Sequence, residues 1–125
     1  MRLLHLWAFP LSFVGLLAAF LCRADYLRPE GEVLLFVAKE RGLCAWFFKC
    51  SKFDAFTWGE VIVFRVPTFS ARLLKHELRH AEQARWFGPL MPVVYGLCSL
   101  WALLKGGHAY RDNALEVDAR RAEWR

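Results

Sequence analysis

The pentapeptide HELRH at residues 76–80 holds two histidines and a glutamate at a spacing that suits metal-dependent hydrolysis. In an α-helix His76 and His80 are neighbours on one face, so their imidazoles can bind one metal ion. Imidazole nitrogens suit Zn²⁺, and a catalytic zinc keeps one position for water. Glu77 lies beside the pair, where it can take a proton from that water and pass it to a leaving nitrogen. This is the HExxH chemistry of zinc metallopeptidases, with Zn²⁺ as the expected cofactor.

Two histidines leave a zinc site incomplete, so a third ligand is expected elsewhere in the chain. One class of zinc peptidase has a glycine three residues and a histidine six residues after the second histidine. Gln83 and Trp86 occupy those positions here, which excludes that class. A glutamate on a later helix is the other common solution, and Glu116 is the best candidate, although its spacing from Asn113 would also complete a capping box. The alternatives for the third ligand are Asp118, Glu123 and His108.

Two predicted helices position these side chains. Apolar residues recur at helical spacing from about Ser70, a suitable N-cap, to a stop at Gly88-Pro89, so HELRH lies inside a helix. A short charged helix from Asn113 to about Trp124, capped by Asp112 or Asn113, carries Glu116.

Strands are expected before the motif helix. Residues 31–51 read as two apolar strands joined by a polar turn at 39–42, and residues 53–66 as a further strand or hairpin around Gly59. The predicted fold class is α+β: a small antiparallel sheet of three to four strands, a zincin-like active-site helix, and two further helices. We expect the strand at 61–66 to offer an edge to an extended substrate.

Composition points to a membrane. The chain is 57% hydrophobic and 16% aromatic with a net charge of +5, and its basic residues follow no nucleic-acid-binding motif, so we expect no nucleic acid partner. Residues 3–22 are long and apolar enough for a transmembrane helix. A cleaved signal peptide is the alternative, which Arg23 disfavours. We therefore divide the chain into an anchor or signal segment at 1–24 and a metal-binding domain at 25–125, with membrane lipid as a partner.

A second apolar run, residues 86–104, cannot simply cross the bilayer. If it did, about 30 Å of hydrocarbon would separate the histidines from Glu116, whereas zinc bonds are about 2 Å long. We therefore expect a packed or membrane-surface helix, a segment that turns back within the membrane being the alternative. Basic residues after residue 22 weakly favour a cytoplasmic domain.

The four cysteines decide little. Cys22 and Cys98 lie in apolar runs, where a cysteine usually acts as a small hydrophobe. Cys44 and Cys50 could form a disulfide, but their spacing fits neither a zinc knuckle nor a redox pair.

Two segments resemble a group of small, uncharacterised bacterial HExxH proteins of the gluzincin type, which carry an N-terminal membrane segment. HELRHAEQARWFGPLMPVVY and AYRDNALEVDAR look like that group's motif and C-terminal signatures, and TWGEVIVFR is similar to its strand before the motif helix. The resemblance implies zinc ligands at His76, His80 and Glu116, Glu77 as the base, and a bacterial inner-membrane location. Ala114 and Leu115 depart from its pattern. Many gluzincins also have an acidic residue four positions after the ligand glutamate, where this chain has Arg120, so a carboxylate that would orient a histidine is missing there unless Asp112 or Asp118 replaces it.

The leading hypothesis is a membrane-associated zinc metallopeptidase acting on a peptide or protein. The alternative is a non-hydrolytic zinc-binding membrane protein or metal sensor, against which Glu77 speaks because a structural site needs no base. The oligomeric state and the bond cleaved stay open. Four side chains are candidates for contacts with the substrate or transition state: Gln83, Tyr95, His108 and Tyr110.

Overall fold

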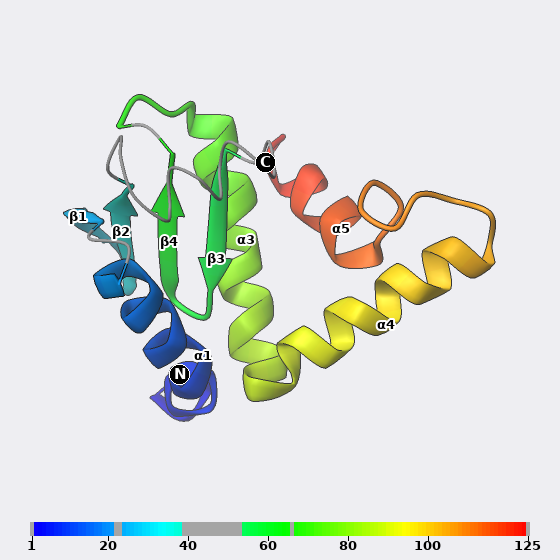
Figure 1. Ribbon diagram of the computed structural model, residues 1–125, viewed down its shortest axis with the longest axis horizontal. Helices are drawn as coiled ribbons and strands as arrows, with labels where there is room; N and C mark the ends of the chain where they lie inside the picture. The colour runs from blue at the N-terminus through cyan, green and yellow to red at the C-terminus, as the bar shows by residue number, and fades with distance from the viewer. Residues whose placement is uncertain (1, 22–23, 39–53, 66, 125) are drawn as a thin grey trace.

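The computed structural model describes residues 2–21, 24–38, 54–65 and 67–124 (Figure 1). In chain order the elements are helix α1 (Arg2–Leu21), strands β1 (Asp25–Glu30), β2 (Val33–Val37), β3 (Ala55–Trp58) and β4 (Val61–Phe64), helix α3 (Ala71–Phe87), the 3-10 turn η1 (Gly88–Leu90), and helices α4 (Met91–Leu104) and α5 (Ala114–Ala122). The predicted α+β class is confirmed at this level. The second apolar strand expected after residue 42 lies outside the described residues.

The four strands form one sheet in the order β1-β2-β4-β3. β1 pairs with β2 and β3 pairs with β4 in antiparallel fashion, but β2 and β4 run parallel, with Leu34 opposite Val61. The prediction of a purely antiparallel sheet is therefore wrong. The expectation that β4 offers an edge to substrate is also wrong, because both of its sides are paired and β3 ends the described sheet.

The physical reason for the mixed sheet is the composition of β4. Its sequence VIVF is a continuous apolar run, and all four residues are buried. Such a run is typical of a strand covered on both faces and paired on both sides. β3, which contains Thr57 and the partly exposed Trp58, is better suited to the end of the sheet. β1 was not predicted, because Pro29 and its charged neighbours suit only an edge strand.

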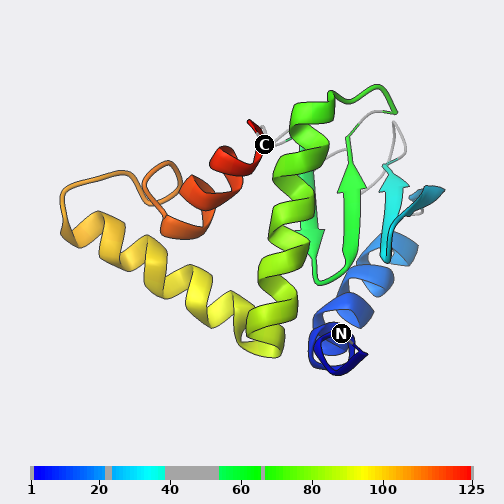
Figure 2. The same ribbon diagram turned by 180° about the vertical axis from the view of Figure 1, so that it is seen from behind.

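Helices cover the two faces of the sheet, α1 on one side and α3 on the other (Figures 1 and 2). Alternate residues of β4 point to opposite faces. Val61 and Val63 pack with Ala19 of α1. Ile62 and Phe64 belong to a second cluster that reaches the α3 residue Ala81. The motif helix is thus fixed to the sheet by its apolar face.

Helix α1 packs closely on the β3–β4 turn. A Cβ added to Gly15 would lie 2.9 Å from both the Trp58 carbonyl oxygen and the Val61 Cβ, so only glycine permits this approach. Ser12 Oγ accepts a 2.9 Å hydrogen bond from the Glu60 backbone N–H. The apolar stretch of α1, Leu6–Phe20, is short for a membrane-crossing helix of about 20 residues, and the use of α1 as a membrane anchor stays a prediction.

The predicted motif helix is confirmed, and its ends are capped as expected. Ser70 Oγ accepts a 3.0 Å hydrogen bond from the Leu73 N–H, and Gly88 ends α3 with a φ of 56°. Asn113 caps α5. These residues fix both ends of α3 and the start of α5.

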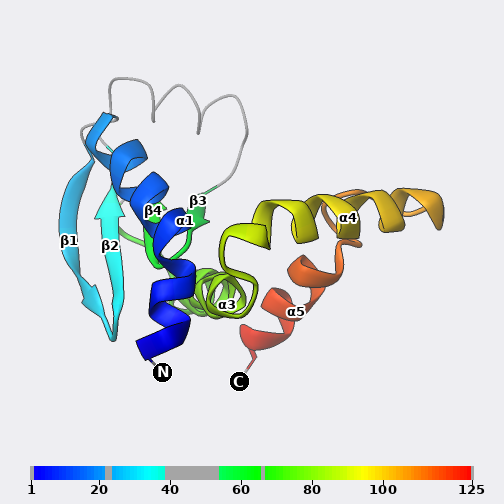
Figure 3. The same ribbon diagram turned by 90° about the horizontal axis from the view of Figure 1, so that it is seen from below.

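Among the residues that the structure describes, one helical stretch, Ala71–Leu104, is long and apolar enough to cross a membrane by length and composition, a test that soluble core helices also pass. It combines α3, η1 and α4, and the chain turns sharply between α3 and α4 (Figure 1). The 14 residues of α4 span roughly 21 Å at 1.5 Å each, less than the roughly 30 Å hydrocarbon core. After α4 the chain returns so that α5 packs against α3 (Figure 3).

Cys98 is a half-buried free thiol on α4, while Cys22, Cys44 and Cys50 lie outside the described residues.

Candidate metal centre

His76, His80 and Glu116 converge in the interior, and all three are buried. Glu116 Oε2 lies 3.0 Å from His76 Nε2 and 3.2 Å from His80 Nε2, and the two Nε2 atoms are 3.2 Å apart. Tetrahedral zinc with bonds of about 2.0–2.1 Å holds its ligand atoms roughly 3.3 Å apart. The donor types and their separations therefore fit a zinc ion bound between α3 and α5.

Each histidine is oriented by a contact at its other ring nitrogen. His76 Nδ1 lies 2.9 Å from Glu123 Oε1, and His80 Nδ1 lies 2.9 Å from Gln83 Oε1. A carboxylate or amide oxygen at Nδ1 favours the tautomer that carries its proton there, leaving Nε2 free to bind metal. Glu123, considered a substitute ligand from the sequence, thus contacts the far side of a histidine instead.

Gln83 also ties the site to α5. Its amide nitrogen donates to the Leu115 carbonyl oxygen at 3.0 Å and to Asp118 Oδ2 at 2.9 Å. Asp118 accepts from Arg79 Nε at 2.7 Å as well. Asp118, the other acidic alternative, therefore braces the two helices beside the cluster.

The Glu116 carboxylate has a third partner. Tyr95 Oη on α4 donates to Glu116 Oε1 at 2.8 Å. The capping-box alternative for Glu116 does not describe the contacts found, because the Asn113 N–H donates to the Tyr110 carbonyl oxygen and the Asn113 side chain caps Leu115. The Glu116 carboxylate therefore contacts the two histidines and Tyr95 rather than the start of its own helix.

Glu77 lies beside the cluster in a buried position, and Thr57 Oγ1 on β3 donates to its Oε2 at 2.6 Å. Burial raises the pKa of Glu77, an effect that His80 and the Thr57 hydrogen bond only partly oppose. A carboxylate with a raised pKa is a better proton acceptor near neutral pH than an exposed one. The geometry suits a general base.

The ligand charges are strongly coupled. Burial alone would raise the pKa of Glu116, but its hydrogen bonds with His76 and His80 outweigh that effect and hold the pKa well below its usual range. For His80, burial acts to lower the pKa, and the Glu116 contact reverses the direction and raises it. The lowered pKa favours the ionised form of Glu116, and a carboxylate beside two imidazoles is a set of ligands that suits Zn²⁺.

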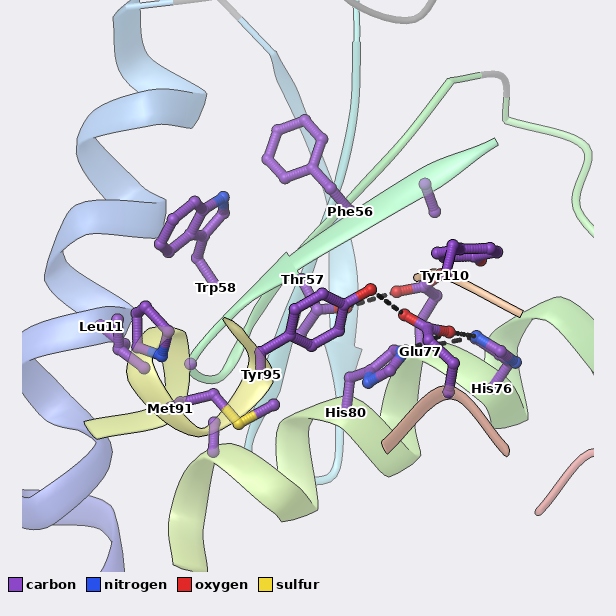
Figure 4. Close-up of a pocket in the computed structure, with 15 residues that line it drawn as sticks. Leu11, Phe56, Thr57, Trp58, His76, Glu77, His80, Met91, Tyr95 and Tyr110 are labelled. Atoms are coloured by element: carbon purple, nitrogen blue, oxygen red, sulfur yellow. Dashed lines mark hydrogen bonds and ion pairs between the residues drawn. The ribbon is translucent and has the colours of Figure 1, made fainter. Parts of the chain in front are cut away.

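A pocket of about 360 Å³ opens beside these groups (Figure 4). Its volume falls within the range of small-ligand sites. One end contains His76 and Glu77, and the other contains Leu11, Trp58 and Met91. The lining residues are Leu11, Ala55, Phe56, Thr57, Trp58, Gly59, His76, Glu77, His80, Ala84, Met91, Pro92, Tyr95, Tyr110 and Glu116.

Of the four predicted substrate-contact residues, Gln83 is buried outside the pocket lining, where it contacts His80. Tyr95 and Tyr110 line the pocket, and burial raises the pKa of Tyr110 to about 12, so its hydroxyl stays protonated at neutral pH. His108 is exposed in the loop before α5, outside the pocket lining. There its Nδ1 accepts hydrogen bonds from the Tyr110 and Arg111 backbone N–H groups.

Sequence reasoning missed two functional contacts. Glu123 follows Glu116 by seven residues, two helical turns, which places both carboxylates on one face of α5. That spacing could have identified it. The contact of Thr57 with Glu77 has no signal in the sequence, because it joins an edge strand to a helix.

Arg120, at the position where gluzincins carry an acid, instead donates to the Arg111 carbonyl oxygen.

No family model, curated protein or solved structure matches this chain. What the site does is therefore inferred from its own geometry, and the gluzincin resemblance stays a prediction.

Proposed function

We propose that this protein is a zinc-dependent hydrolase, a metallopeptidase in kind, associated with a bacterial membrane. One observation carries the proposal: three buried ligand atoms lie 3.0–3.2 Å apart, with the buried carboxylate of Glu77 beside them in the wall of a pocket. A structural site needs neither an adjacent base nor a pocket.

His76, His80 and Glu116 would hold the zinc, which when bound supplies a Lewis acid and lowers the pKa of water. Glu77 then accepts a proton at its carboxylate and returns it to the leaving nitrogen. Thr57 Oγ1 donates a 2.6 Å hydrogen bond to one oxygen of that carboxylate, which leaves the other oxygen to accept the proton. Tyr110 lines the pocket wall with a protonated hydroxyl that already interacts with Glu116, and it is the candidate for stabilising a developing oxyanion.

β3 supplies the means to hold a peptide. It ends the described sheet and lines the pocket with Ala55, Phe56, Thr57 and Trp58. An extended peptide can add through backbone hydrogen bonds to a strand at the end of a sheet. Glu77 contacts the same strand through Thr57, so an amide aligned there would lie near the base.

The competing function is a non-hydrolytic zinc-binding membrane protein or metal sensor. It shares the ligands but gives no role to Glu77, a buried carboxylate in the wall of the pocket. A closed structural site would also lose its fold when zinc is removed.

The test is zinc content by mass spectrometry on detergent-purified full chain, together with hydrolysis of peptide mixtures. We expect about one zinc ion per wild-type chain, little in His76→Ala and Glu116→Ala, and a wild-type amount in the control His108→Ala. Glu77→Gln should keep zinc and lose hydrolysis. A wild-type protein without zinc, or Glu77→Gln with full hydrolysis, would refute the metallopeptidase.

A further inference from the structure

Helix α4 has two unlike faces. Val93, Leu97, Leu100 and Leu104 recur at spacings of three and four residues, so they share one side of the helix, and each is more than half exposed. Tyr95 and Met91 lie on the opposite side and line the pocket. One face of α4 therefore forms the site while the other presents an apolar stripe outward.

Helix α1 repeats this arrangement. Ala8, Leu11 and Ala19 are buried on one side of α1, where Ala19 packs against the sheet. The opposite side exposes a row of large apolar side chains: Leu3, Leu6, Phe9, Phe13, Leu17 and Phe20. Leu11 also reaches the pocket, so both apolar helices contribute a wall to it.

The two helices meet next to the pocket. Trp7 Nε1 of α1 donates to the Trp86 carbonyl oxygen at 3.2 Å, just before the chain turns into α4. From there α1 runs over the sheet and α4 runs away from it (Figure 1). Leu11, Met91 and Pro92 form the end of the pocket that lies between them.

The occupant that fits these faces is the surface of an anionic bilayer. Helix α4, which carries the stripe, is roughly 21 Å long, too short to span the membrane but suited to lying in its interface. Lys105 Nζ lies 4.9 Å over the Trp101 ring at the end of α4, a pairing suited to the headgroup region. The chain's net charge of +5 complements anionic lipid.

We propose that the pocket receives its substrate from the bilayer surface. The substrate is a peptide segment already bound to the membrane, with an apolar side chain at the Leu11–Met91 end of the pocket and its amide near Glu77. The substrate class rests on the proposed hydrolase; the orientation of the pocket toward lipid does not.

Orientation is tested by fluorescence quenching. Full-length protein is bound to vesicles of phosphatidylcholine and phosphatidylglycerol whose acyl chains carry bromine, which quenches nearby tryptophan. Trp58 lines the pocket, whereas the control Trp124, 72% exposed, follows α5. We expect Trp58→Phe to remove part of the quenchable emission and Trp124→Phe to remove none. A Trp58→Phe protein with undiminished quenchable emission would overturn the orientation.

Substrate class is tested with a random peptide library, free or carrying a palmitoyl group, in the presence of the same vesicles. Membrane-bound substrate is concentrated at the site, so zinc- and Glu77-dependent cleavage of the palmitoylated library should be faster by on the order of tenfold. Leu97→Asp combined with Leu100→Asp, on the outer face of α4, should remove this preference and keep cleavage of the free library. Equal rates for both libraries with wild type would overturn the inference and leave the hydrolase intact, whereas cleavage of neither would refute the hydrolase itself.

Discussion

Replacing Glu123 with alanine tests how the metal centre is built. His76 Nδ1 lies 2.9 Å from Glu123 Oε1, with the two side chains 9% and 20% exposed. Removing such an outer hydrogen bond typically costs about 10–100-fold in metal affinity. Because Glu123 is partly solvated, water can take over some of its role, so we expect a loss of about tenfold, equivalent to about 1.4 kcal/mol.

The assay is zinc affinity by competition with a chromophoric chelator, followed by Co²⁺ substitution. Glu123→Ala should bind about tenfold more weakly while Co²⁺ keeps a tetrahedral spectrum, since the three ligands remain. Glu123→Gln, which retains an oxygen acceptor for Nδ1–H, should lose less. Glu82→Ala is the control, because Glu82 is an exposed glutamate whose described partner is Arg79.

An unchanged zinc affinity in Glu123→Ala would refute the claim that this carboxylate orients His76. A lost tetrahedral spectrum would refute it differently, since Glu123 would then be a ligand. Thermal unfolding of each metal-free variant separates both outcomes from a simple loss of fold.

Two further predictions concern stability. Burial raises the pKa of Glu77 above 4.5, so the ionised carboxylate opposes folding. In thermal unfolding at pH 8, metal-free Glu77→Gln should therefore melt at a higher temperature than metal-free wild type, and this difference in melting temperature should shrink as the pH falls toward 4.5. A difference that stays constant with pH would contradict the prediction. Asn113 is fully buried and caps α5, and its side-chain amide donates to the Tyr95 carbonyl oxygen at 3.1 Å and to Ser99 Oγ at 2.8 Å. Asn113→Ala should therefore lower the free energy of unfolding, measured in urea, by about 2 kcal/mol. Asn113→Ser, which keeps a capping oxygen, should cost less, and equal losses would show that capping contributes little.

Local patterns predicted the helical parts of the site well. The spacing of His76 and His80 fixes their shared face in any helix, and Ser70 and Gly88 mark where that helix begins and ends. Glu116 was predictable because a glutamate on a later helix is a common third ligand beside an HExxH motif. All of this information lies within single segments.

Local sequence patterns did not predict the contacts between different segments. The parallel pairing of β2 with β4 depends on how two hairpins lie side by side, and neither hairpin encodes its neighbour. The same holds for Thr57, which reaches Glu77 only because β3 ends the sheet next to α3. The spacing from Glu116 predicts the face of α5 on which Glu123 lies, but it does not predict that Glu123 contacts His76.

The three residues of the candidate metal site are not synthesised together. Glu116 follows His80 by 36 residues, and α4 lies between them. At ordinary translation rates a ribosome needs roughly 2–7 s to add that stretch. Throughout this interval the nascent chain has both histidines but not the carboxylate that completes the trio. In the proposed enzyme, complete zinc binding would come only after α4 has been made, so the chain could reach a lipid surface before it could hydrolyse a substrate.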